Sequence, residues 1–258
     1  MSLKKAGKME ALPKRFGRVS GGLGIAAAMV VVLLFVGSAA AAPAISAAST
    51  VTYKAPYSGA AYGTINDYST GCGVAMSAPV LPVMNLTSGY AFESVKASAR
   101  SCGGQNGTGN VQAVESFFSS TFNATTKGLH RWTSEWVANF SVKLKATPGG
   151  PTQPAMAGFA VNANFQLIDT TNGSEFFPST VPIVELYIST GTYSHSYAHL
   201  HQVVQLNVTL AKGHTYLFIA EMSIYVYVAV SPGASTASAS VNMGSNGRNA
   251  FLESVIER

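Results

Sequence analysis

The stretch from Leu200 to Val230 constrains the fold most, because its residues alternate between apolar and polar. A period of two places alternate side chains on opposite faces of a β-strand, one buried and one in water. Lys212 and Gly213 separate two such runs, and glycine can take the positive φ of a tight reversal. The pattern therefore predicts two strands joined as an antiparallel β-hairpin. Its apolar positions are Leu206, Val208 and Leu210 before the turn and Tyr216, Phe218, Ala220, Met222, Ile224, Val226 and Val228 after it.

The same alternation recurs twice upstream, where it predicts two more half-buried strands. Asn172 and Gly173 supply a hairpin-type turn after the second. The first row comprises His130, Trp132, Ser134, Trp136, Ala138, Phe140, Val142 and Leu144, and the second comprises Phe159, Val161, Ala163, Phe165 and Leu167.

Weaker patterns complete the list of expected elements. Pro79 and Pro82 restrict the segment 74–86 to a sheet edge, because proline cannot donate to a central ladder. The segment 111–122 fits a short helix as well as a strand. Glycine, serine and tyrosine predict loops at 56–73 and 191–198. Further strands are expected at 51–53, 90–101, 184–188, 238–243 and 251–256.

Eight or more strands with scarcely any helix predict an all-β fold. We expect a two-sheet antiparallel β-sandwich with jelly-roll or Greek-key wiring, preceded by an N-terminal hydrophobic helix. The expected organisation is a basic region at 1–20, a hydrophobic segment at 21–47 and one β-sandwich domain at 48–258.

The N-terminus carries the features of an export signal. Six basic residues and one acidic residue fall within the first 20 positions, and residues 21–42 are uncharged. These 22 residues would span about 33 Å as a helix, enough to cross a bilayer. Small residues follow, which is typical of a secretory signal cut after Ala40 or Ala47. The alternative is a retained membrane anchor. Both place the remainder outside the cytoplasm, secreted or at the cell surface.

The positive charge of the chain belongs to this N-terminus alone. The formal net charge is +5 for the whole sequence, and the first 20 residues supply all of it. The rest has as many acidic as basic residues and therefore no basic patch. We do not expect nucleic-acid binding, which needs clustered lysine and arginine.

Cys72 and Cys102 are the only cysteines, and both lie in glycine- and serine-rich surroundings. An even count in an oxidising compartment predicts one disulfide bond. No CxxC spacing supports a metal site at these residues.

Six N-x-S/T triplets predict a glycoprotein whose asparagines are exposed. If the host does not glycosylate asparagine, the same triplets are ordinary polar strand surface. The candidates are Asn85, Asn106, Asn123, Asn139, Asn172 and Asn207.

The C-terminal part resembles a group of bacterial and archaeal exported surface proteins, the choice-of-anchor kind. The similarity rests on about 45 residues whose shared positions are Leu210, Gly213, Tyr216, Ser238, Ala239, Ser240, Val241, Leu252, Glu253 and Ser254. The resemblance implies a surface location and a β-sandwich. The C-terminal sorting helix with a basic tail that such proteins carry is missing here.

Histidines form one candidate metal site. If the segment around them is extended, odd positions share a face, so His199 and His201 would lie side by side. His195 or His214 would supply a third imidazole, a set that suits Zn²⁺ or Cu²⁺. The alternative is a solvated histidine face at a sheet edge.

Trp132, Glu135 and Trp136 form a candidate carbohydrate site, because flat aromatic rings stack on sugars and a carboxylate can bind hydroxyls. The alternation of faces along a strand opposes this interpretation, because both tryptophans fall on the apolar row and Glu135 on the opposite face. The tryptophans then belong to the core.

No catalytic motif is present: the sequence lacks H-E-x-x-H, G-x-S-x-G, a phosphate-binding glycine loop and a calcium loop. We therefore expect a non-enzymatic surface or envelope protein with a structural or adhesion role, contacting envelope proteins or glycans. One alternative is a secreted carbohydrate-binding or metal-binding domain. Another is a filament subunit that donates an unpaired strand such as Val51–Tyr53 to a neighbour.

Overall fold

The computed structural model describes residues 44–45 and 50–257, apart from 103, 178–180 and 245–248. The predicted leader lies outside this part, except for Ala44–Ile45, which form the short strand β1. In the described residues, no helix is long and apolar enough to cross a membrane.

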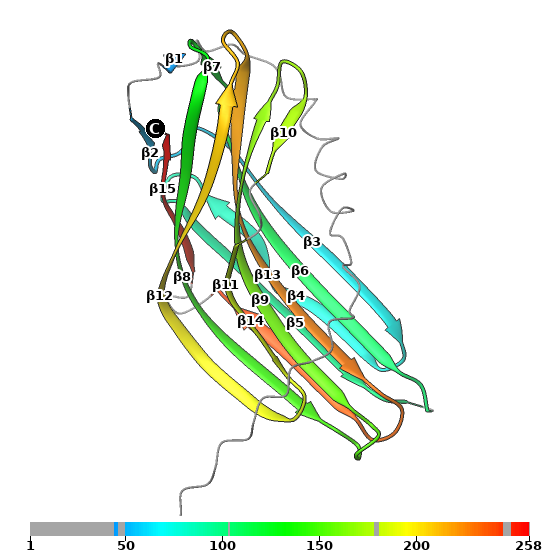
Figure 1. Cartoon of the computed structure of the whole chain (residues 1–258). Coiled ribbons are helices and arrows are strands. Elements are labelled where there is room, and N and C mark those ends of the chain that lie inside the picture. Colours follow the sequence, from blue (N-terminus) through cyan, green and yellow to red (C-terminus); the bar gives the residue numbers. More distant parts are fainter. Residues whose placement is uncertain (1–43, 46–49, 103, 178–180, 245–248, 258) are drawn as a thin grey trace, which may run out of the picture. The chain divides into compact units, whose positions relative to one another are not determined.

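The described chain forms two facing β-sheets (Figure 1), which confirms the predicted all-β sandwich. Sheet A contains eight strands: β1 (Ala44–Ile45), β3 (Gly59–Gly71), β6 (Gly107–Ser119), β7 (Phe122–Ala124), β9 (Ala155–Asp169), β10 (Ser174–Phe176), β11 (Val181–Ile188) and β13 (Thr215–Val230). Sheet B contains seven: β2 (Val51–Tyr53), β4 (Val74–Asn85), β5 (Tyr90–Arg100), β8 (Gly128–Thr147), β12 (Gly191–Leu210), β14 (Thr236–Asn242) and β15 (Ala250–Glu257). All pairings are antiparallel except that of β1 with β7.

The predicted hairpin of β12 and β13 is wrong. The two strands do follow each other through a tight turn, and Gly213 has φ +83°. However, β12 pairs with β8 in sheet B, whereas β13 pairs with β6, β7 and β9 in sheet A. The turn therefore carries the chain from one sheet to the other. Both strands bury one face in the same core. Their apolar and polar residues therefore alternate as in the two strands of a hairpin, although the strands do not pair.

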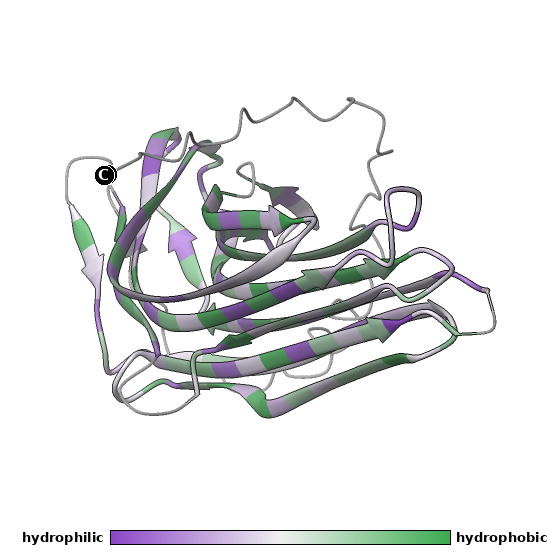
Figure 2. Cartoon of the chain, turned by 90° about the horizontal axis from the view of Figure 1, so that it is seen from below, coloured by the Kyte–Doolittle hydropathy of each residue, from purple (hydrophilic) through white to green (hydrophobic). Residues whose placement is uncertain are grey.

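The predicted apolar rows line the core between the sheets. Trp132, Phe140, Phe165 and Phe218 are all fully buried, and bands of alternating hydropathy run along the strands (Figure 2). The ring of Trp132 lies 5.8 Å from that of Phe218 and 6.1 Å from that of Phe165. At roughly 2 kcal/mol for each large apolar side chain removed from water, this row is a main source of stability.

Two sequence expectations about local structure are corrected, and one open alternative is settled. The segment 56–73 is mostly strand β3 and not a loop, and nearly all its side chains are exposed. The segment 191–198 is the first part of β12 and not a loop. The segment 111–122, which fitted helix or strand equally, belongs largely to β6. Glycine and serine in exposed strands lack the apolar alternation by which strands are recognised.

The edge strands follow the predictions more closely. β4, which contains Pro79 and Pro82, pairs only with β5, and its register shifts on either side of Val80. β2 pairs with β15, and Tyr53 stacks on Trp132 with ring centres 6.3 Å apart. The strand expected to be unpaired is therefore hydrogen-bonded along one side within its own sheet.

Cys72 and Cys102 form the predicted disulfide, with Cα atoms 6.0 Å apart. Cys72 follows β3 of sheet A, and Cys102 follows β5 of sheet B, so the bond joins the ends of the two sheets.

Candidate functional site

Polar and aromatic side chains gather on the outer face of sheet B, where four strands are in register. Tyr90 of β5 pairs with Phe251 of β15, which pairs with Val137 of β8, which pairs with His201 of β12. Cross-strand partners on one face lie about 5 Å apart. The ring centres of Tyr90 and Phe251 are 5.1 Å apart. Four strands far apart in sequence thus build one continuous surface row.

A shallow pocket of about 450 Å³ opens on this row. Val137 and the rings of Tyr90 and Phe251 give it an apolar part, and side-chain amides, an imidazole and a carboxylate give it a polar part. This combination is typical of small-ligand sites. We call it the outer-face pocket; its lining residues are Tyr90, Val137, Asn139, His199, Asn249, Phe251 and Glu253.

Hydrogen bonds hold the amide side of the pocket in place. The Asn139 side-chain oxygen accepts from the backbone N–H of His199 at 2.9 Å, and its Nδ2 donates to Asn249 Oδ1 at 3.4 Å. The backbone N–H of Asn139 donates to the Asn249 carbonyl at 2.8 Å. The polar groups of the pocket are therefore oriented before any ligand arrives.

Beside the pocket, one imidazole and two carboxylates converge from three adjacent strands. The candidate ligand atoms of Glu135, His201 and Glu253 all lie within 4.8 Å of one another. His201 Nε2 is 3.8 Å from Glu253 Oε2, and both side chains are about half exposed. Ser254 Oγ donates to Glu135 Oε2 at 3.0 Å. Glu253 belongs to this cluster and also lines the outer-face pocket.

A second, larger hollow of about 560 Å³ lies elsewhere on sheet B. Its walls are small side chains of β4, β5 and β14 together with Arg100 and Lys145. It contains no aromatic ring or carboxylate. Because it offers few groups that could orient a ligand, we consider the outer-face pocket the better candidate despite its smaller volume.

The predicted histidine site does not form. Between the pairs Tyr197–Phe140 and Leu200–Ala138, β12 has one residue more than β8, and His199 has φ +53° at this bulge. An extra residue exchanges the faces of all later side chains. His195 precedes the bulge and pairs with the buried Val142, so it lies on the inner side, where its ring centre is 4.5 Å from that of Tyr197. His201 points outward instead, toward two glutamates that the sequence analysis did not connect with it.

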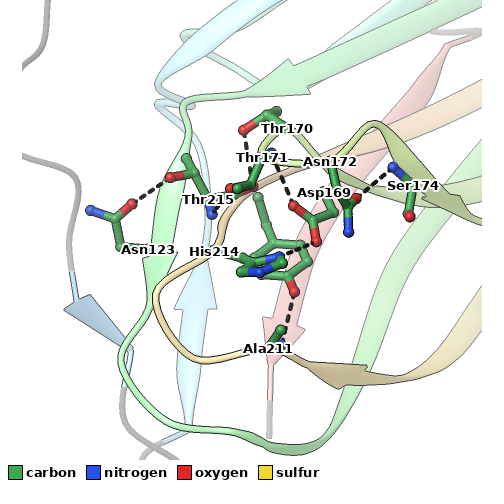
Figure 3. Close-up of polar contacts among 10 residues, drawn as sticks. Asn123, Asp169, Thr170, Thr171, Asn172, Ser174, Ala211, His214 and Thr215 are labelled. Atoms are coloured by element: carbon green, nitrogen blue, oxygen red, sulfur yellow. Dashed lines mark hydrogen bonds and ion pairs between the residues drawn. The ribbon is translucent and has the colours of Figure 1, made fainter.

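The fourth predicted metal ligand, His214, has a different role. Figure 3 shows it beside Asp169 at the turn before β13. Its Nδ1 lies 2.7 Å from Asp169 Oδ2, and the backbone N–H of Thr171 donates to Asp169 Oδ1. Burial opposes ionisation of Asp169, but these hydrogen bonds outweigh it and lower the pKa of the carboxyl. The pair fixes the crossing between the sheets.

The predicted carbohydrate trio is divided between the two faces of β8. Trp132 and Trp136 are 0% exposed, so neither can stack on a sugar, and the core alternative was right. Glu135 lies on the outer face as its parity predicted. The aromatic rings on this face of the sheet are those of Tyr90 and Phe251, which β5 and β15 contribute. No sequence spacing relates these residues to Glu135, because only the register of the sheet brings them together.

Asparagines of five predicted glycosylation triplets are exposed, namely Asn85, Asn106, Asn123, Asn172 and Asn207. Asn139 is half-buried, and its amide is hydrogen-bonded in the outer-face pocket. Glycosylation stays a prediction for the five exposed sites, and geometry disfavours it at Asn139.

Two pairs of titratable side chains are buried away from the site, one of two glutamates and one of a histidine and a glutamate. Glu93 of β5 and Glu115 of β6 lie between the sheets, and burial raises the pKa of both carboxyls. The backbone N–H of Val83 donates to Glu115 Oε1 at 2.7 Å, whereas neither oxygen of Glu93 has a hydrogen-bond partner in the described part of the chain. His130 Nδ1 lies 2.7 Å from Glu257 Oε1, and burial raises the pKa of Glu257 to about 7.

Comparison with known proteins adds little to this geometry. No protein-family model matches the chain, and no curated protein matches it. Among solved structures it is similar to TmCBM61 in complex with β-1,4-galactotriose, with 10% sequence identity and a TM-score of 0.22. The match covers 73% of this chain and 88% of that one. A likeness at this TM-score carries no argument about function.

Proposed function

We propose that this chain is an exported, non-enzymatic protein of the cell surface or envelope that adheres to carbohydrate through the outer-face pocket. The observation that carries the proposal is the pairing of Tyr90 and Phe251 beside oriented amides and a carboxylate. Aromatic rings stack on the apolar faces of sugars, and amide and carboxylate groups bind hydroxyls. In this proposal Tyr90 and Phe251 take the sugar-stacking role that the sequence suggested for the two tryptophans, which are buried.

Export is supported by the disulfide, because such bonds persist in oxidising compartments outside the cytoplasm. The five exposed asparagines are compatible with a glycosylated surface. The resemblance to choice-of-anchor surface proteins and the N-terminal leader remain predictions that agree with this location. A non-enzymatic role is proposed because the pocket contains one carboxylate, Glu253, and no nucleophile beside a base.

A binding assay with immobilised neutral oligosaccharides tests the proposal. We expect the purified chain to retain at least one of them and to release it chemically unchanged. Tyr90→Ala and Phe251→Ala should each weaken binding about fivefold, since an aromatic contact contributes roughly 1 kcal/mol beyond its buried area. Leu129→Ala is the matched control, because Leu129 is 73% exposed on β8 and does not line the pocket.

Two outcomes would reject carbohydrate adhesion at this site. One is that the chain retains none of the panel. The other is that retention by the Tyr90→Ala/Phe251→Ala double variant equals that of the unmodified chain. Recovery of cleaved oligosaccharide would instead contradict the non-enzymatic part.

A further inference from the structure

The cluster of Glu135, His201 and Glu253 has the geometry of a metal site built on rigid elements. β8 contributes Glu135, and β12 and β15, which both pair with β8, contribute the other two. Bulges in the flanking strands create the arrangement. One lies between Tyr197 and Leu200, and the other places Glu253 between the paired residues Leu252 and Ser254. Bulges commonly re-aim side chains at functional sites.

The distances suit a small tetrahedral cation. Zinc binds histidine nitrogen and carboxylate oxygen at about 2.1 Å, so two ligands of a tetrahedral site are about 3.4 Å apart. His201 Nε2 and Glu253 Oε2 are 3.8 Å apart, and the third ligand atom lies within 4.8 Å of both. Small rotations of the half-exposed His201 and Glu253 side chains would close the remaining gaps.

The charges of the cluster also point to a cation. Two carboxylates face each other, and within the described residues no lysine or arginine comes within 4.0 Å of either. The ion pairs found in this part of the protein all use histidine. Bringing like charges together is unfavourable unless a cation neutralises them.

We propose that Glu135, His201 and Glu253 bind one Zn²⁺ ion on the outer face of sheet B. Three protein ligands leave the fourth position of a tetrahedral ion for water or for a ligand group. Because Glu253 also lines the outer-face pocket, this open position borders the pocket. The metal site differs from the predicted histidine set, of which it keeps only His201, and it does not depend on carbohydrate binding.

Isothermal titration calorimetry tests the site with ZnCl₂ and the full chain, first stripped of metal with a chelator. We expect one Zn²⁺ per chain. His201→Ala and Glu253→Gln should each weaken binding at least tenfold, since both remove a ligand. His195→Ala is the matched control, because it removes an exposed imidazole from the inner side of the same strand and should leave the affinity unchanged.

Folding of each variant is checked by near-ultraviolet circular dichroism, which reports the buried tryptophans. Absence of zinc binding by the unmodified chain would overturn the site, and so would equal affinity in His201→Ala. Oligosaccharide retention measured in chelator separates the two proposals. If it persists there while zinc binding fails, only the metal site is lost, and the reverse result rejects only carbohydrate adhesion.

Discussion

Glu93 provides the sharpest test of the electrostatics of the core. Its side chain is 1% exposed, and neither carboxylate oxygen has a hydrogen-bond partner among the residues that the structure describes. Burial is the largest cause of its raised pKa, and the charge of Glu115 raises the pKa further. Burial therefore favours the protonated form of Glu93 in the folded protein over that in the unfolded chain.

The free-energy cost follows from the proton balance. Each pH unit above the ordinary pKa of 4.5 costs about 1.4 kcal/mol, as long as the folded carboxyl remains neutral. The folded state binds one proton more than the unfolded state, so stability falls as pH rises. The penalty is absent below about pH 4.5 and grows until pH reaches the pKa of the folded state.

Glu93→Gln removes this titration while keeping the shape of the side chain. Urea unfolding at pH 5, 6, 7 and 8 measures the free energy of unfolding of each protein. Relative to the unmodified chain, the variant should gain stability as pH rises, by about 1.4 kcal/mol per pH unit for as long as the folded carboxyl of Glu93 stays protonated. The slope is the decisive quantity, since a buried amide has a constant desolvation cost of its own.

Leu129→Ala serves as the control, because Leu129 is 73% exposed on β8 and carries no titratable group, so its replacement should leave the slope unchanged. A difference between Glu93→Gln and the unmodified chain that stays constant from pH 5 to pH 8 would refute the reasoning. It would mean that Glu93 is ionised in the folded protein.

Three further predictions concern stability. Replacing Cys72 and Cys102 by serine should lower the free energy of unfolding by roughly 3 to 4 kcal/mol, since the bond closes a loop across a sequence separation of 30; urea unfolding of the double variant, compared with the oxidised chain, measures this. Trp132→Ala should cost about 3 to 5 kcal/mol in the same assay, because a fully buried indole leaves a cavity, and a loss below about 1 kcal/mol would contradict its placement. Asp169→Asn should cost about 2 kcal/mol at pH 7 by weakening the bond to His214. Since the folded pKa of Asp169 is lowered, its contribution is present above pH 4 and disappears as pH falls through the folded pKa; a difference that persists at acid pH would argue against this pair.

Alternation along the chain determined which side chains are buried. The row from Trp132 to Leu144 and the row from Phe159 to Leu167 could be assigned to the core from sequence alone, and both are buried. The disulfide could also be predicted, because two cysteines allow one pairing. The buried rows follow from local alternation within one strand, and the disulfide follows because two cysteines can pair in one way.

Strand partners and the candidate site were decided by the tertiary structure. The alternation of β12 and β13 predicts two half-buried strands, but a buried face is compatible with either sheet. Alternation alone predicts that His201 and His195 share a face, but one extra residue of β12 between them places them on opposite faces. Glu253 meets Glu135 and His201 only because β15 and β12 flank β8. Periodicity reports the direction of a side chain relative to its own strand, whereas neighbours depend on register, which long-range packing sets.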